Sequence, residues 1–193
     1  MRVLIACEFS GAVREAFKNL GHQAISCDLL DTEIPGEHYK GDVRNILYDD
    51  WDLMVAFPPC TYLAVSGARW FRERQKDQEE ALDFIRLLLN APIEKIALEN
   101  PVGVISTRIR KPDQIIQPWQ FGHPESKKTC LWLKNLPKLK STSILQIPDK
   151  GYWNNQTPSG QNKLGPGPMR AKNRSRTYIG IAQAMAEQWA GIK

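Results

Sequence analysis

The sequence predicts an α/β fold built on a doubly wound, mostly parallel sheet. Two observations predict it: short apolar segments of strand type alternate with amphipathic segments of helical period, and their order is strand, helix, strand, strand, helix, strand. That order is typical of parallel βαβ units. With 193 residues, the chain is long enough for one domain with a substantial core and too short for two. We therefore expect a single domain over residues 1–193.

The first half of the sheet is predicted from two apolar segments and a helix between them. The segment at 2–7 (RVLIAC) has the composition of a buried strand and is followed by the turn-forming pair Ser10 and Gly11. A second strand, QAISC at 23–27, ends at Asp28. The intervening helix is predicted from apolar residues at helical spacing, namely Ala12, Ala16, Phe17 and Leu20.

The second half follows the same logic. WDLMVAF at 51–57 is a third strand, and KIALENP at 95–101 is a fourth. Between them, residues 72–90 form an amphipathic helix whose acidic residues lie early, as the helix dipole favours. Its predicted buried residues are Leu82, Ile85, Leu88 and Leu89. KKTCLWL at 127–133 is a candidate further strand.

The C-terminal part carries fewer structural signals. Residues 148–176 contain many Gly, Pro, Asn and basic residues, which predicts a long loop. Residues 176–189 (RTYIGIAQAMAEQW) predict a closing helix. The residues of its apolar face are Ile181, Ala184, Met185 and Gln188. No internal repeat or interdomain linker is visible.

The charge is distributed unevenly. The whole chain has a net charge of +5, but residues 126–186 contain eleven Lys or Arg and a single acid, Asp149, so the remainder is net negative. Such a basic C-terminal third favours a polyanionic partner, with phosphates first. A solvated basic surface without a partner explains the same charges.

Cysteine and histidine usage gives no sign of a metal site. The four cysteines and three histidines show no metal-ligand spacing, so we expect no metal. The N-terminal apolar run is interrupted by Glu8 and is too short for a signal peptide, and no segment approaches the length of a membrane helix. We expect a cytoplasmic protein with free thiols and no membrane association.

Polar and reactive residues follow the ends of four predicted strands. They are the turn at 8–11 (EFSG), Asp28, the corner at 57–60 (FPPC) and the segment at 98–101 (LENP). Because the carboxyl ends of parallel strands meet at one edge, these four features can converge on one crevice. The glycine turn suits a nucleotide-like group, and the acid suits ribose hydroxyls. Two prolines restrict the corner and present Cys60, although a free cysteine also serves as a small buried apolar residue.

With these motifs the sequence resembles the DNA cytosine-5 methyltransferases, particularly the small phage-type members, over about residues 2–104 and again in the C-terminal helix. The resemblance implies a Rossmann-like, S-adenosylmethionine-dependent methyltransferase fold. It assigns cofactor contacts to Phe9, Ser10, Gly11, Asp28, Asp42 and Pro58. It assigns the chemistry to Pro59, Cys60, Glu99 and Asn100.

The resemblance also implies a mechanism on DNA. Cys60 as thiolate adds to C6 of cytosine, which makes C5 nucleophilic toward the methyl group. Glu99 in its protonated form hydrogen-bonds N3, which requires burial to raise its pKa. Release of the C5 proton and of Cys60 then gives 5-methylcytosine. Two alternatives stay open: a non-catalytic nucleic-acid-binding relative, and a methyltransferase acting on a free cytosine nucleotide.

The chain departs from that family at three points. Val13 or Ala12 stands where the cofactor turn usually has a second glycine, and the Gln-x-Arg-x-Arg motif is not found, with 126–129 (SKKT) as its candidate substitute. Only about forty residues, 134–176, stand in place of a target-recognition domain, so we expect a basic, loop-rich insertion there.

This short insertion predicts loose or single-strand recognition, or dependence on a helper protein. The predicted nucleic-acid contacts are Lys127, Lys128, Lys163, Arg170, Lys172, Arg174 and Arg176. RNA is an alternative partner for this basic region. Trp119, Tyr152 and Trp153 could stack on bases or pack in the core.

Overall fold

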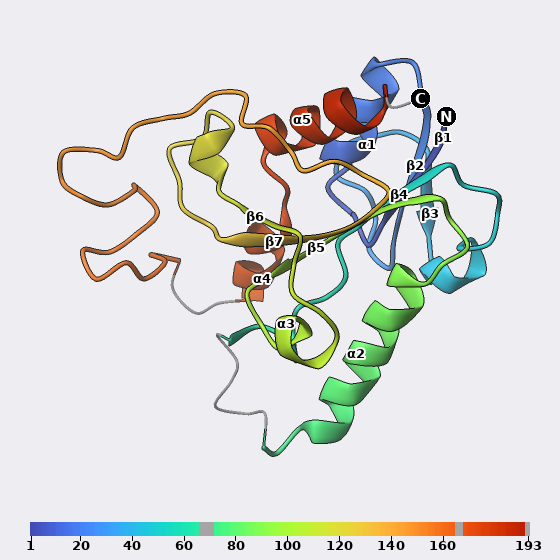
Figure 1. The fold of residues 1–193 in the computed structure, drawn as a ribbon, viewed down its shortest axis with the longest axis horizontal. Helices are drawn as coiled ribbons and strands as arrows, with labels where there is room; N and C mark the ends of the chain where they lie inside the picture. The colour runs from blue at the N-terminus through green and yellow to red at the C-terminus, as the bar shows by residue number, and fades with distance from the viewer. Residues whose placement is uncertain (66–71, 165–167, 192–193) are drawn as a thin grey trace.

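A computed structural model describes residues 1–65, 72–164 and 168–191. Within these ranges the chain forms a seven-stranded sheet in the order β3-β2-β1-β4-β5-β7-β6 (Figure 1). The strands are β1 (Arg2–Ala6), β2 (Gln23–Asp28), β3 (His38–Lys40), β4 (Leu53–Ala56), β5 (Lys95–Pro101), β6 (Gln114–Ile116) and β7 (Thr129–Lys134). Ser66 and Gly67, which follow the predicted corner, and residues 165–167 of the predicted loop lie outside the described residues.

The sheet is mostly parallel. β1 pairs in parallel with β2 and β4, and the pairs β2–β3 and β4–β5 are also parallel, whereas β7 runs antiparallel to both β5 and β6. The predicted α/β class is therefore confirmed. The strand order reverses between β1 and β4, and open α/β sheets bind ligands beside the carboxyl ends of the strands at such a point.

Helices cover both faces of the sheet (Figure 1). Their bounds are α1 (Ala12–Asn19), α2 (Gln75–Leu89), α3 (Ile105–Arg108), α4 (Pro168–Ser175) and α5 (Ile179–Trp189). Leu82, Ile85 and Leu88 of α2 are fully buried in the hydrophobic cluster on one face. Phe17 of α1 and Trp189 of α5 are fully buried in the cluster on the other face. Each face of the parallel strands is therefore buried, as their continuous apolar sequences predict.

The α1 helix has the predicted extent but not the predicted buried face. The structure buries Val13, Arg14 and Phe17, whereas Leu20 is 47% exposed. Leu20 lies beyond the last helical residue, so the helical spacing no longer places it over the sheet. In α5, Gln188 is only partly buried, and its side chain exchanges hydrogen bonds with the Lys140 main chain.

The long loop predicted at 148–176 is wrong in its last third, because α4 occupies Pro168–Ser175. A proline at the first helical position fits a helix start, since it lacks the amide that would be unpaired there. The helix is short, rich in basic residues and has few apolar residues, so the sequence signal for it is weak. Lys172 within it and Arg176 directly after it form ion pairs with Glu33.

The segment before α4 is irregular and extends to one side of the sheet (Figure 1). Trp119 and Trp153 stack on each other with ring centroids 6.1 Å apart, and Trp153 is only 5% exposed. These two tryptophans therefore follow the packing alternative. Tyr152 is half-buried, with the ammonium groups of Lys150 and Lys163 5.1 and 5.9 Å from its ring centroid.

Candidate active site

A cleft of about 1810 Å³ lies along the carboxyl edge of the sheet. Its walls include side chains at or just after the ends of β1, β2, β4 and β5. These are the four strand ends at which the sequence predicts a common crevice. The predicted site residues that line it are Phe9, Asp28, Pro58, Pro59, Cys60, Glu99, Asn100, Lys127, Lys128, Lys163, Arg170, Lys172, Arg174 and Arg176. Ser10, Gly11 and Asp42 are not among the lining residues.

Cys60 is presented to solvent at the corner after β4. All four cysteines lie in the described part of the chain, and only Cys60 is exposed, because Cys7 is partly buried and Cys27 and Cys130 are buried. The amides of the residues that follow fold back onto the Cys60 carbonyl, with Leu63 and Ala64 each donating at 3.0 Å. The alternative of a small buried core residue is therefore wrong for Cys60.

Glu99 and Asn100 form the carboxyl end of β5. Burial raises the pKa of Glu99, against the opposing charge of Lys127 and a hydrogen bond with the Thr129 side chain. Asn100 is 1% exposed, and its Nδ2 donates to the Pro58 carbonyl at 2.9 Å. This bond ties the end of β5 to the proline corner, which has lost two amide donors of its own.

A main-chain contact joins the loop after Cys60 to the loop after Glu99. The Val104 amide donates to the Leu63 carbonyl at 2.9 Å, and Ala64 and Gly103 form an antiparallel bridge. A Cβ atom added at Gly103 would overlap the Leu63 carbonyl oxygen. Only glycine allows this approach, so the two reactive side chains are carried by loops fixed to each other.

The charges around Cys60 act in opposite directions. Although the Cys60 residue is exposed, the surrounding cleft walls partly desolvate its thiol and raise the thiol pKa. The negative charge of Glu99 raises it further, while Arg174 and Lys127 lower it. Because burial favours the protonated form of Glu99, the repulsive contribution of Glu99 disappears in that form. A neutral Glu99 therefore removes one of the two effects that disfavour the thiolate, which leaves burial opposed by the two cations.

The first turn of α1 is occupied by a buried carboxylate. Glu8, 4% exposed, accepts hydrogen bonds from the amides of Val13 at 2.8 Å and Arg14 at 3.3 Å, and from the Ser10 hydroxyl at 2.9 Å. Gly11 adopts a left-handed φ of 78°. The structure thus places Ser10 and Gly11 behind the cleft wall, where they shape the turn that carries Phe9.

The two acids predicted to hold the cofactor lie in different surroundings. Asp28 lines the cleft, and one of its oxygens accepts from the Leu30 amide at 2.9 Å. Asp42 caps a short 3₁₀ turn (Val43–Asn45) by accepting from the Arg44 amide at 2.9 Å. Asp28 is therefore placed to meet a ligand, whereas Asp42 already serves as a cap.

Arg14 supports the site from behind, and the sequence gives no sign of it. Its side chain is fully buried, and its guanidinium donates to the hydroxyls of Ser26 at 2.9 Å and Thr32 at 3.1 Å and to the Ile34 carbonyl. It also pairs with Glu15 at 2.9 Å. Arg14 thereby holds the loop after β2 against α1.

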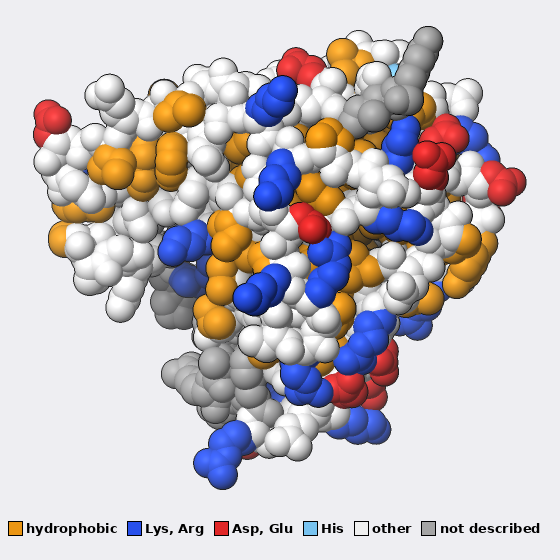
Figure 2. Space-filling model, in the orientation of Figure 1, with side chains coloured by type: hydrophobic (Ala, Val, Ile, Leu, Met, Phe, Trp, Pro, Cys, Tyr) orange, Lys and Arg blue, Asp and Glu red, His pale blue; other side chains and the backbone are white. Residues whose placement is uncertain are grey.

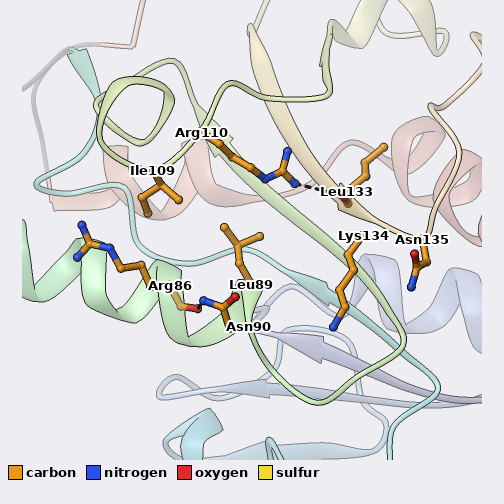
Figure 3. Close-up of a pocket in the computed structure, with 8 residues that line it drawn as sticks. All are labelled: Arg86, Leu89, Asn90, Ile109, Arg110, Leu133, Lys134 and Asn135. Atoms are coloured by element: carbon orange, nitrogen blue, oxygen red, sulfur yellow. Dashed lines mark hydrogen bonds between the residues drawn. The ribbon is translucent and has the colours of Figure 1, made fainter.

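A second hollow, of about 420 Å³, lies beside the end of α2 (Figure 3). It contains three cations, Arg86, Arg110 and Lys134, but each is already paired. Their partners are Glu79 and Asp83 for Arg86, Asp113 for Arg110, and the carbonyls of Ala91 and Ile93 for Lys134. We therefore place the functional site in the larger cleft.

Lys and Arg side chains are spread over the face shown in Figure 2, with few acids between them. In the described ranges, no group of three or more His, Cys, Asp or Glu residues could hold a metal ion. No helix among the described residues is long and apolar enough to cross a membrane.

Comparison with known proteins assigns neither a family nor a function. No model of a known protein family matches the chain, and no curated protein does. A solved structure of similar fold is a candidate DNA modification methyltransferase encoded within an E. coli prophage, with 12% identity and a TM-score of 0.47. The match covers 69% of this chain and 46% of that protein, so the chain spans less than half of its length. At this similarity the comparison defines no family, and a functional assignment depends on the cleft itself.

Proposed function

We propose that the protein is an S-adenosylmethionine-dependent methyltransferase that methylates C5 of cytosine in DNA through a covalent bond to Cys60. One observation supports this most: an exposed Cys60, a partly buried Glu99 and an acid at the end of β2, Asp28, all line one cleft. Their charges also interact, since Glu99 acts on the Cys60 thiol.

The cofactor half of the cleft suits a nucleoside without phosphates. Sheets of this kind usually bind a pyrophosphate on the amides of the helix after β1. Here the buried Glu8 side chain already accepts from two of those amides, so they are not free to bind a phosphate. S-adenosylmethionine carries no phosphate, and when bound it supplies a methyl group on a positively charged sulfur. Asp28 keeps an oxygen for the ribose, while Phe9 and Leu30 supply apolar walls.

The acceptor half suits activation of a cytosine ring. The Cys60 thiolate adds to C6, which breaks the C5–C6 double bond and leaves C5 nucleophilic. Protonated Glu99 donates to N3 and stabilises the charge that develops on the ring. After C5 has gained the methyl group, C5 loses its proton and the Cys60–C6 bond breaks, which restores the ring and the thiolate.

Lys127 and Arg174 take a more direct part than general contact with phosphates. Both lower the pKa of the Cys60 thiol, and Lys127 also acts on Glu99. Lys127 follows Ser126, whose main chain exchanges hydrogen bonds with Asn155 at 2.9–3.0 Å. We infer that this segment replaces the arginine motif that the sequence lacks.

The acceptor base must be unpaired or flipped out of a duplex, because C6 is out of reach in a base stack. Lys128, Lys163 and Arg170 line the cleft and can contact phosphates, which gives binding with little sequence readout. We therefore propose loosely sequence-specific or single-stranded DNA as the substrate.

The test is covalent trapping. DNA carrying 5-fluorocytosine cannot lose the substituent at C5 as a proton, so the Cys60 bond to C6 should persist after methylation. We expect a protein–DNA adduct that requires S-adenosylmethionine, that peptide mapping locates at Cys60, and that Cys60→Ala abolishes. An adduct at another residue, or one that persists in Cys60→Ala, would refute the mechanism.

A non-catalytic, nucleic-acid-binding protein is the second candidate. The observation in its favour is that burial and Glu99 both raise the pKa of the Cys60 thiol, which disfavours the nucleophilic form. Absence of an adduct with single-stranded DNA, duplex DNA and free cytosine nucleotide, together with salt-sensitive oligonucleotide binding, would support it. Competition between RNA and DNA at fixed salt would identify the preferred partner.

A further inference from the structure

Glu33, in the loop between β2 and β3, forms a paired contact with α4 and the residue after it. Its carboxylate accepts from Nε and Nη2 of Arg176 at 2.8 and 2.7 Å, and Lys172 Nζ lies 3.1 Å from the same carboxylate. Glu33 and Arg176 are 143 positions apart in the sequence. The contact joins two segments that the strand pairing of the sheet does not connect.

This bridge lies at the Phe9 end of the cleft. The Glu33 amide donates to the Phe9 carbonyl at 2.8 Å, and Lys172 Nζ lies 5.2 Å from the centroid of the Phe9 ring. Lys172 and Arg176 both line the cleft. The carboxylate of Glu33 therefore sits where two cleft cations converge.

Arg176 contacts the Glu33 carboxylate through two N–H groups, which is also how an arginine binds a phosphate. An arginine fork binds carboxylates and phosphates through the same pair of parallel N–H bonds. The side chains of Lys172, Arg176 and Glu33 are 36%, 43% and 28% exposed, so water and ligands reach them. Ion pairs this exposed are weak, and a polyanion that offers several phosphates can replace the carboxylate.

We propose that Lys172 and Arg176 form a phosphate-binding site that Glu33 occupies in the free protein, and that a phosphate of bound nucleic acid displaces Glu33. The inference rests on the proposed function for the identity of the polyanion. Arg174 lies between these two residues but acts on Cys60 rather than on Glu33. Of the four basic residues in and directly after α4, Arg174 thus serves the thiol, Lys172 and Arg176 form this phosphate site, and Arg170 is a separate cation of the cleft.

Displacement of Glu33 has a consequence for the cofactor half. It releases the loop after β2, which includes Leu30 of the cleft wall, from α4. Phosphate binding and the Glu33 bridge exclude each other, and such coupling is reciprocal. Hydrogen exchange of the Glu33 amide should therefore quicken when a polyanion binds.

The test uses a fluorescent oligothymidylate, which contains no cytosine, so its binding is independent of methyl transfer. Glu33→Gln should tighten binding about two- to fivefold at low salt, because the competing ion pair is weak. The slope of log affinity against log salt should stay near the wild-type value, because the same two cations meet phosphates in both complexes. Lys172→Ala with Arg176→Ala should flatten that slope by up to about 1.4, at about 0.7 for each cation lost on a single strand. Asp31→Asn is the matched control, because Asp31 pairs with Lys40, which is not a cleft residue.

The effect should vanish when Glu33→Gln is combined with Lys172→Ala and Arg176→Ala, with unchanged thermal midpoints showing that the variants are folded. Glu33→Gln binding no tighter than Asp31→Asn would overturn the proposal, as would an unchanged salt slope in Lys172→Ala with Arg176→Ala. So would failure of the wild-type protein to bind oligothymidylate at all. Tight oligothymidylate binding together with no 5-fluorocytosine adduct would support the phosphate site. That combined result would contradict only the proposed methyltransferase chemistry.

Discussion

Replacing Arg14 by methionine should destabilise the protein by about 3–5 kcal/mol, which is typical when one partner of a buried charged network is removed. Methionine retains most of the length of the side chain, so the change removes the charge and its hydrogen bonds rather than the packing. The fully buried guanidinium binds two hydroxyls and one carbonyl, and it also acts on the buried carboxylate of Glu8.

The magnitude follows from those contacts. Hydrogen bonds to a charged group contribute about 1.5–3 kcal/mol each, so the three bonds to uncharged partners sum to roughly 4.5–9 kcal/mol before compensation. Relief of the cost of burying the charge returns part of this, which leaves about 3–5 kcal/mol. For a chain of this size, 1 kcal/mol shifts Tm by about 2–4 °C, so the expected loss is about 6–20 °C.

Urea and thermal unfolding measure the effect directly. The matched control is Lys18→Met. Lys18 is a cation of the same helix and also pairs with Glu15, but its side chain is 39% exposed. It should cost less than about 1 kcal/mol. If Arg14→Met is no less stable than Lys18→Met, then Arg14 does not hold the loop after β2 against α1, and its proposed supporting role behind the cleft is wrong.

Two further predictions concern the reactive pair. Lys127→Met should slow alkylation of Cys60 by iodoacetamide severalfold near neutral pH, because Lys127 lowers the thiol pKa. The control variant Lys128→Met should not slow it. Equal alkylation rates of the two variants, followed by intact mass, would contradict this prediction. Burial raises the pKa of Glu99 above the 4.5 of an unperturbed glutamate, so the native state keeps a proton that the unfolded chain loses as pH rises above that value. The contribution of Glu99 to stability should therefore fall as the pH rises above about 4.5, and the stability of Glu99→Gln in urea should increase relative to the wild type over the same rise. A constant difference would show that Glu99 titrates normally.

The regular core of the fold could be predicted because its signals are local. The strand at 95–101 and the apolar face of α2 follow from periodicity within one segment, and both appear in the structure close to the predicted bounds. β3 and β6 have only three residues each and no period to detect. α4 is short and has few apolar residues, and its ion-pair partner, Glu33, lies far away in the sequence.

The candidate site likewise contains residues that the sequence could predict and residues that it could not. Cys60 and Glu99 could be placed together because parallel strands share an edge, and both line the cleft. Arg14 could not be recognised, because an arginine within an amphipathic helix normally faces solvent, and its burial depends on hydroxyls and a carbonyl from another loop. The contact between Arg176 and Glu33 could not be predicted either, because the two residues are distant in the sequence.

The bridge between Ala64 and Gly103 determines how this protein can vary. Since backbone atoms hold the two loops in register, the outward-facing side chains of both loops can change widely while the spacing between sulfur and carboxyl is kept. Position 103 has no such freedom, since even alanine would push one loop away from the other. Natural variants and engineered libraries should therefore tolerate diversity along these loops and select against every residue but glycine at that one place.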